Sequence, residues 1–278
     1  MDQPIKEKIY LYFYFMNKFA FLLFISSVTI VFCQNQKPNL VAVNSIRFDA
    51  DEFLGYDSFG FYYTVKNNIF SKIGTRETFV YQNFTLGKIT KVDLQNPLKI
   101  VLFYENFNTV VTLDNQLNEI QKVNFSESSV PIVVTAIGIA SQNQFWIYNS
   151  LNQQIGLFDY LNQNYKPISV PLTDSIAYYT SDFNTFYWID STNNWYSCDI
   201  FGKVSKKGLI PDYDLIVIVN DNQYLYSKNG VLKFIDVQKE QKTEIEIAEK
   251  SFKKFYYKDQ ILSIFTTSGI TNYKITIP

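Results

Sequence analysis

The sequence predicts an all-β fold, a six-bladed β-propeller, on three observations. Aromatic residues make up 18% of the 278 residues and charged residues another 18%, a composition that favours strands. Short apolar runs alternate with Asn- and Asp-rich turns, most clearly in residues 98–120, which is typical of antiparallel strands joined by hairpins. The same unit recurs about every forty residues, and such a period with several short strands is typical of propeller blades.

The first 33 residues are expected to be a signal peptide. Residues 19–32 form an almost unbroken apolar run after Lys18, and a run of about fourteen residues is too short for a membrane span. Met16 would then be the natural initiator, with residues 1–15 read from an upstream start. The alternative is that residues 1–15 lengthen the run into an uncleaved anchor. Residues 34–40 follow as a polar linker, and residues 41–278 form the propeller domain.

Hairpin turns define the repeat. First turns of the units are expected at residues 57–60, 141–144, 181–184, 220–223 and 258–260, and second turns at 66–68, 150–152, 191–193, 228–230 and 267–269. Asn229-Gly230 is the strongest signal, because both central residues of a type I′ turn need positive φ. Six units begin near Phe53, Leu98, Val134, Ile176, Leu215 and Phe252. Residues 75–86 are expected to be an insertion in the first unit.

The two ends of the domain complement each other. The last unit has only three strands before Pro278, whereas residues 41–48 form a strand without a hairpin partner. We expect this N-terminal strand to complete the C-terminal blade, because ring closure leaves only short outer edges exposed. The chain then forms six blades, with seven blades as the alternative.

Three units share an apolar-Asp-apolar triplet at the end of the third strand, at Asp159, Asp199 and Asp236. With the segment NGVLKFID at residues 229–236, this pattern resembles the NHL and YVTN-type repeats of β-propeller proteins over nearly all of residues 41–278. The chain also resembles uncharacterised exported propeller-like proteins of Bacteroidota. The resemblance implies the fold and no particular activity.

Charge and histidine content exclude several classes of function. The 25 basic and 26 acidic side chains nearly cancel, so no overall field attracts nucleic acid. The sequence contains no histidine, which excludes histidine-dependent triads and removes the commonest transition-metal ligand. Cleavage after Cys33 would leave Cys198 as a single thiol, expected to pack as a small hydrophobic residue. We expect no cofactor and no bound metal.

Five aspartates are weak candidates for binding. Asp159, Asp199 and Asp236 could form a carboxylate ring for a cation or sugar, but we favour the interpretation that they accept backbone N–H bonds in the following turns. Asp212 and Asp214 flank Tyr213, and paired carboxylates can act on glycosides. A loop between blades explains this pair equally well, so no catalytic residue is assigned.

Two further clusters have alternative interpretations. Asp49, Asp51 and Glu52 could hold Ca²⁺ through oxygen ligands, but they lack the spacing of an EF-hand and are better explained as solvated charges. An aromatic set could form a platform for carbohydrate, although its recurrence at matching blade positions favours packing between blades. The set consists of Trp146, Tyr148, Tyr187, Trp188 and Trp195.

We therefore expect an exported, non-enzymatic β-propeller that acts as a binding or scaffold module in the periplasm or cell envelope. Its partner would be an envelope protein or a glycan, bound by loops on one face of a monomeric ring. A membrane is involved only if the leader is uncleaved. The alternative is a propeller-type hydrolase or lyase acting on saccharides or lactones through channel carboxylates, which requires Asp or Glu from three or more blades at the axis.

Overall fold

The computed structural model describes residues 14, 16, 38–128 and 130–276, and Pro38–Thr276 form one compact unit. The predicted cleavage after Cys33 and most of the leader lie outside the described residues. In the described part of the chain, no helix combines the length and the hydrophobicity needed to cross a membrane. Its helices include two short 3₁₀ turns, η1 (Glu105–Phe107) and η2 (Phe125–Glu127).

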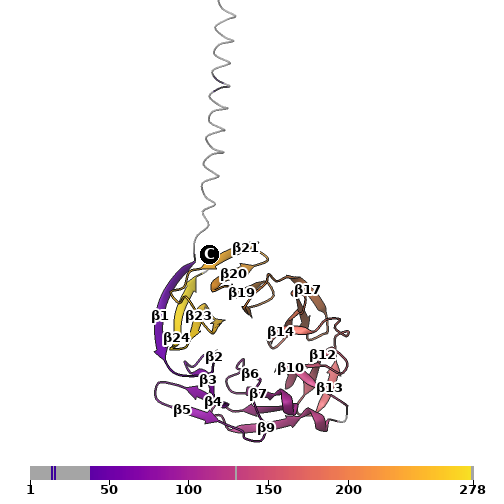
Figure 1. Cartoon of the computed structure of the whole chain (residues 1–278). Helices are drawn as coiled ribbons and strands as arrows, with labels where there is room; N and C mark the ends of the chain where they lie inside the picture. The colour runs from indigo at the N-terminus through magenta and orange to yellow at the C-terminus, as the bar shows by residue number, and fades with distance from the viewer. Residues whose placement is uncertain (1–13, 15, 17–37, 129, 277–278) are drawn as a thin grey trace, which may run out of the picture. The chain divides into compact units, whose positions relative to one another are not determined.

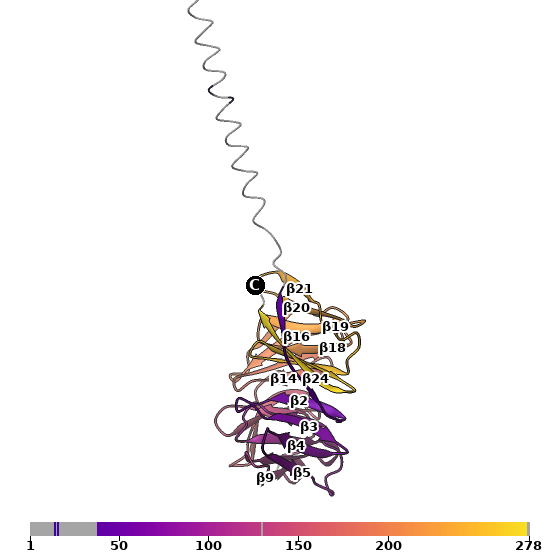
Figure 2. The ribbon, with the colours of Figure 1, turned by 90° about the vertical axis from the view of Figure 1, so that its left-hand side faces the viewer.

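Six four-stranded sheets are arranged in a ring, seen along its axis in Figure 1 and edge-on in Figure 2. Blade 1 contains β2 (Glu52–Tyr56), β3 (Tyr62–Lys66), β4 (Ile69–Ile73) and β5 (Thr78–Tyr81). Blade 2 contains β6 (Lys91–Asp93), β7 (Ile100–Tyr104), β8 (Thr109–Leu113) and β9 (Glu119–Asn124). Blade 3 contains β10 (Val134–Ile139), β11 (Gln144–Asn149), β12 (Gln154–Asp159) and β13 (Asn164–Pro167).

The other three blades continue the same pattern. Blade 4 contains β14 (Ile176–Ser181), β15 (Thr185–Asp190), β16 (Asn194–Asp199) and β17 (Val204–Leu209). Blade 5 contains β18 (Leu215–Ile218), β19 (Gln223–Lys228), β20 (Val231–Asp236) and β21 (Gln241–Ile245). Blade 6 contains β22 (Lys254–Lys258), β23 (Ile261–Thr266), β24 (Gly269–Thr276) and β1 (Asn39–Arg47). The predicted six-bladed propeller is confirmed, and seven blades are excluded for this chain.

Local turn chemistry explains the hairpins. Asn229 and Gly230 have φ values of 52° and 77°, as the predicted type I′ turn between β19 and β20 requires. Asn67 and Asn68, between β3 and β4, also have positive φ. Asparagine tolerates this region better than most residues, so the Asn-rich turns fix the hairpins at these positions.

The ring is closed by β1, which pairs antiparallel with β24 from Asn39 opposite Thr276 to Arg47 opposite Gly269. Both views show β1 in indigo beside β24 in yellow (Figures 1 and 2). Gly269 permits the approach, because a Cβ there would lie 2.1 Å from the carbonyl oxygen of Ile46. The predicted pairing of the N-terminal strand with the C-terminal blade is confirmed.

Blade 2 begins earlier than predicted. The sequence pattern placed its start near Leu98 and an insertion at residues 75–86, whereas β5 is the fourth strand of blade 1 and β6 is the first strand of blade 2. Leu98 lies in the turn after β6. The apolar pattern missed β6 because this strand has three residues, two of them charged.

Aromatic side chains fill the spaces between blades. All five members of the predicted aromatic set are buried, so they pack between blades and do not form a carbohydrate platform. The indole N–H of Trp146 in blade 3 donates to the carbonyl oxygen of Asp182 in blade 4, at 2.9 Å. Trp195 in blade 4 meets Tyr224 in blade 5 edge to face, with ring centroids 5.6 Å apart. These contacts stabilise the junctions between neighbouring blades.

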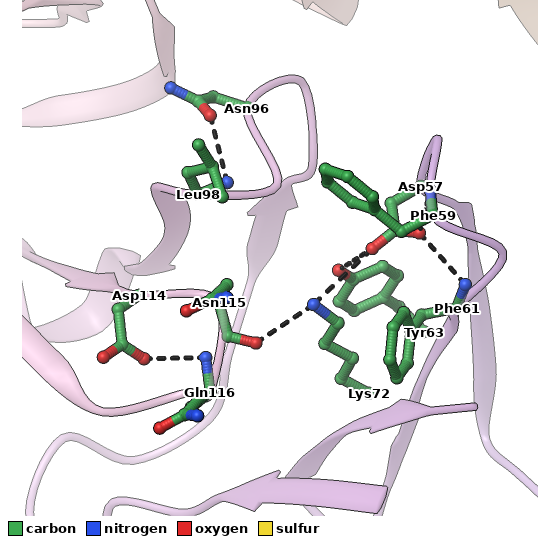
Figure 3. Close-up of polar contacts among 10 residues, drawn as sticks. All are labelled: Asp57, Phe59, Phe61, Tyr63, Lys72, Asn96, Leu98, Asp114, Asn115 and Gln116. Atoms are coloured by element: carbon green, nitrogen blue, oxygen red, sulfur yellow. Dashed lines mark hydrogen bonds and ion pairs between the residues drawn. The ribbon is translucent and has the colours of Figure 1, made fainter. Parts of the chain in front are cut away.

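A buried ion pair within blade 1 also contacts blade 2 through its lysine (Figure 3). Lys72 Nζ lies 3.6 Å from Asp57 Oδ2 and donates to the carbonyl oxygen of Asn115 in blade 2, at 3.0 Å. The Tyr63 hydroxyl donates to Asp57 Oδ2 at 2.7 Å, and the ring of Phe61 lies against the ammonium group. Both charged side chains are almost fully buried, so each depends on the other for compensation.

Candidate functional site

The first strands of the blades surround a cavity of about 590 Å³ on the ring axis, which we call the channel. All six first strands (β2, β6, β10, β14, β18 and β22) contribute to its wall. Figure 1 shows β2, β6, β10 and β14 around the middle of the ring. The volume falls within the roughly 300–1,000 Å³ typical of small-molecule sites, so the channel is the candidate functional site.

Two carboxylates in the channel wall connect neighbouring blades. Glu52 in blade 1 forms an ion pair with Lys254 in blade 6. Asp93 accepts hydrogen bonds from the backbone N–H groups of Gln95 and Ile139, both at 2.8 Å, and so connects blade 2 to blade 3. Both carboxylates therefore have structural partners.

Lys91 and Asp93 are two oppositely charged residues of the channel wall whose pKa values are both shifted. They are two residues apart in β6, so their side chains lie on the same face of the strand. Burial lowers the pKa of Lys91 and raises the pKa of Asp93, because each charged form loses hydration. Lys91 Nζ lies 4.7 Å from the centroid of the Tyr179 ring.

Tyrosine side chains make up another part of the channel wall. Tyr178 and Tyr179 on β14 and Tyr256 on β22 line the channel. The Tyr256 ring packs directly over Gly55, where a Cβ would lie 2.6 Å from the ring. Burial raises the pKa of Tyr178 to about 12, so its phenol is neutral at physiological pH and can donate a hydrogen bond.

Carboxylates from four blades border the channel, and each has a partner. Glu52 pairs with Lys254, Asp93 and Asp182 accept backbone N–H bonds, and Asp214 contacts Lys228. Glu52 begins β2 and Asp214 precedes β18, whereas Asp93 ends β6 and Asp182 follows β14. Because every blade repeats the same meander, the first two lie toward one end of the channel and the last two toward the other.

Asp159, Asp199 and Asp236 are the last residues of the third strands β12, β16 and β20 and are absent from the channel wall. Each Oδ1 accepts backbone N–H bonds in the following turn: from Leu161 and Asn162, from Phe201 and Lys203, and from Lys239, at 2.9–3.0 Å. The N–H of Asn162 is the main reason that the pKa of Asp159 is lowered. These aspartates act as turn caps in the structure.

Asp212 and Asp214 share one lysine. Lys228 Nζ lies 2.8 Å from Asp212 Oδ2 and 3.0 Å from Asp214 Oδ1. The N–H of Asn229 also donates to Asp214 at 2.7 Å, and this bond together with Lys228 lowers the pKa of Asp214. Asp214 borders the channel whereas Asp212 is exposed, so the structure does not present them as an acid and base facing one bond.

The acidic residues 49–52 also have separate partners. Asp49 pairs with Lys66 at 2.6 Å, Asp51 accepts from the N–H of Asn67 at 2.7 Å, and Glu52 pairs with Lys254. Nowhere in residues 38–128 and 130–276 do three carboxylate or cysteine side chains lie close enough together to hold a metal ion.

Cys198 is fully buried between blades 3 and 4, and burial raises the pKa of its thiol to about 12. We expect the thiol in the folded protein to resist a soluble disulfide reagent at pH 8, because the reactive thiolate is both scarce and inaccessible. Absorbance of the released thiol product measures the reaction on a chain that begins at Gln34. The same reagent should label Cys198 completely in guanidinium chloride.

A matched control places a thiol on the surface. Ser268 is exposed in the turn between β23 and β24, so Ser268→Cys should add one rapidly reacting thiol to the folded protein. Rapid labelling of Cys198 in the unmodified folded chain would contradict the buried, inert assignment.

Sequence reasoning missed the residues that define the channel. Lys91, Asp93, Tyr179 and Tyr256 were not among the candidates, because they come from short inner strands far apart in the sequence. The usable signal was the Lys-Val-Asp pattern of residues 91–93, which puts two charges on one face of a strand.

No protein-family model matches the chain, and no curated protein matches it. Solved structures with the same fold do match. Virginiamycin B lyase from Staphylococcus aureus has a TM-score of 0.57 and 9% identity, covering 87% of this chain and 100% of the other. A histidine-to-alanine variant of that lyase, described as catalytically inactive, also matches, with a TM-score of 0.54 and 12% identity over 86% and 88% of the two chains.

Two further bacterial proteins match with similar scores. A DUF4221 family member from Bacteroides vulgatus has a TM-score of 0.56 and 9% identity, covering 88% of this chain and 99% of the other. BamB from Moraxella catarrhalis has a TM-score of 0.52 and 11% identity, covering 84% and 97%. The resemblance to β-propeller proteins is thereby confirmed at the level of the fold. Sequence identities this low do not show that these proteins share an activity with this chain.

Proposed function

We propose that the protein is an exported, non-enzymatic β-propeller that binds a ligand at the channel and acts as a binding or scaffold module in the cell envelope. One observation carries this proposal: tyrosine rings and a lysine face the channel, while every carboxylate that borders it is held by a backbone N–H or a lysine. Such a wall can recognise a ligand without a free acid and base. The envelope location in this proposal rests on residues 1–33, which the sequence pattern predicts to be a signal peptide.

The test is capture from an envelope extract by the immobilised protein and by a variant with a narrowed channel. Ala177 is exposed in the channel wall on β14, so Ala177→Trp adds bulk there without entering the core. We expect a glycan or protein to be retained by the unmodified protein and lost with Ala177→Trp. Equal recovery on both columns, or recovery of the native protein only from the cytoplasmic fraction, would contradict the proposal.

The alternative of a hydrolase or lyase is favoured by one observation, the opposite pKa shifts of Lys91 and Asp93 in the channel. The histidine-to-alanine variant of virginiamycin B lyase is catalytically inactive. This chain contains no histidine, so it cannot use a histidine side chain for catalysis. An enzyme would release a captured saccharide or lactone as cleaved product. A binding module would return it intact, which mass spectrometry distinguishes.

A further inference from the structure

Blades 1 and 5 have the same polar arrangement around the turn between their second and third strands. Each turn consists of two residues with positive φ, and the first of them donates its N–H to an aspartate at 2.7 Å. The lysine before each turn pairs with an aspartate of the same group. The groups are Asp49, Asp51, Lys66 and Asn67 in blade 1, and Asp212, Asp214, Lys228 and Asn229 in blade 5. The turns differ in their second residue, which is Asn68 in blade 1 and Gly230 in blade 5.

This second residue decides how firmly each turn is held. The Asn68 side chain donates to the carbonyl oxygen of Gly87 at 2.6 Å and accepts from the N–H of Ile89 at 2.8 Å. Gly230 has no side chain to make such bonds. A Cβ built on Gly230 would lie 3.5 Å from the carbonyl oxygen of Lys250, the one described atom within 4 Å outside residues 229–231. The turn of blade 5 is therefore loosely surrounded.

The side-chain amide of Asn229 is also unrestrained. Asn229 is exposed, and within residues 38–128 and 130–276 only its backbone N–H, and not its side chain, forms a hydrogen bond. The sequence has one Asn-Gly pair and two Asn-Ser pairs, which begin at Asn44 and Asn149. Asn44 accepts from the side chain of Asn272, and Asn149 is buried and accepts from the N–H of Val133.

An exposed asparagine before a glycine can react with its own main chain. The nitrogen of Gly230 attacks Cγ of Asn229, so the N–Cγ bond forms and the Cγ–Nδ2 bond breaks. Nδ2 leaves as ammonia and takes the proton of the Gly230 N–H. Water then opens the five-membered succinimide. Cleavage at Cγ gives aspartate, and cleavage at the main-chain carbonyl carbon gives isoaspartate. Each product has a carboxylate in place of the amide.

We infer that Asn229 is a site of spontaneous deamidation in the folded protein, and that Asn67 in the matching turn of blade 1 is stable. This goes beyond the proposed function and does not depend on what the channel binds. The glycine leaves the attacking nitrogen unhindered, whereas Asn68 places a side chain beside it and fixes the turn.

The reaction changes both the charge and the backbone of blade 5. The new carboxylate lies beside Asp212 and Asp214, which already share Lys228. Isoaspartate also lengthens the main chain within a turn whose two residues suit a type I′ hairpin. Both effects weaken the hairpin of β19 and β20, so the converted chain should melt at a lower temperature than the fresh chain.

Peptide mapping by mass spectrometry tests the inference on a chain that begins at Gln34, incubated at pH 8. Conversion exchanges NH for O, and electron-transfer fragmentation distinguishes isoaspartate from aspartate. We expect Asn229 to convert about tenfold or more faster than Asn67, because only Asn229 precedes a residue without a side chain. Conversion should be slower at pH 6, because the attacking nitrogen must lose its proton.

Gly230→Asn is the matched control, because it copies the turn of blade 1. Asparagine tolerates positive φ, as Asn68 shows, so this variant should keep the melting temperature of the unmodified chain. Its added side chain should slow conversion at Asn229 about tenfold or more.

Three results would overturn the inference: equal rates at Asn229 and Asn67, an unchanged rate in Gly230→Asn, or conversion of Asn229 only after unfolding in guanidinium chloride. The last would show that the folded turn holds the nitrogen of Gly230 away from Cγ.

Discussion

A chain that begins at Phe48, and so lacks β1, is expected to lose its cooperative thermal transition. β1 forms eight registered pairs with β24, and each backbone hydrogen bond contributes about 1 kcal/mol net. The loss is on the order of the whole stability of many domains, about 5–15 kcal/mol. Phe48 is kept because it stacks on Tyr62 and Phe265, so the deletion tests the strand alone. Circular dichroism during heating compares this chain with one that begins at Gln34.

A peptide of residues 38–47 provides the control for this deletion. Added in excess to the truncated chain, it should restore the transition, because a ligand that binds only the folded ring stabilises it by mass action. Identical melting of the two chains without peptide would show that the pairing of β1 with β24 does not hold the ring together.

Asp57→Ala is expected to destabilise the ring by about 3–5 kcal/mol, the usual effect of leaving one member of a buried ion pair uncompensated. Lys72 would keep the carbonyl oxygen of Asn115 and the rings of Phe61 and Tyr63 as neighbours, but no carboxylate of the described chain in direct contact. The Tyr63 hydroxyl would lose its acceptor as well. Urea denaturation followed by tyrosine and tryptophan fluorescence measures the change in the free energy of unfolding.

Two further variants test whether the loss of stability in Asp57→Ala comes from the buried lysine that is left unpaired. Asp49→Ala also removes the carboxylate of a lysine ion pair, but Asp49 and Lys66 are exposed, so the denaturation midpoint should be unchanged. The double variant Asp57→Ala/Lys72→Met should be more stable than Asp57→Ala alone, because it no longer buries an unpaired ammonium group. A double variant as unstable as Asp57→Ala would mean that Asp57 acts mainly through Tyr63 and its turn.

Local features of the sequence predicted the architecture well. The turn at Asn229-Gly230 follows from backbone sterics, and the caps formed by Asp159 and Asp199 depend only on residues a few positions away. The closure of the ring was predictable because one end of the domain had an extra strand and the other end lacked one. These features require no knowledge of how distant segments meet.

The channel could not be predicted in the same way. Lys91 and Tyr179 meet because blades 2 and 4 face one axis, and nothing near either residue in sequence specifies the other. The ion pair of Asp57 and Lys72 was missed for a related reason, since burial of a lysine in a strand depends on the neighbouring blade. Strand β6 was missed because two of its three residues are charged, which leaves no apolar run to recognise.

The pairing of the first strand with the last also bears on biosynthesis. The edge of β24 that receives β1 does not exist until Thr276 has left the ribosome, so a growing chain carries complete blades 1 to 5 without a closed circle. Such an open arc exposes blade faces and strand edges that invite association with other chains. Closure of the ring must therefore follow the synthesis of β24.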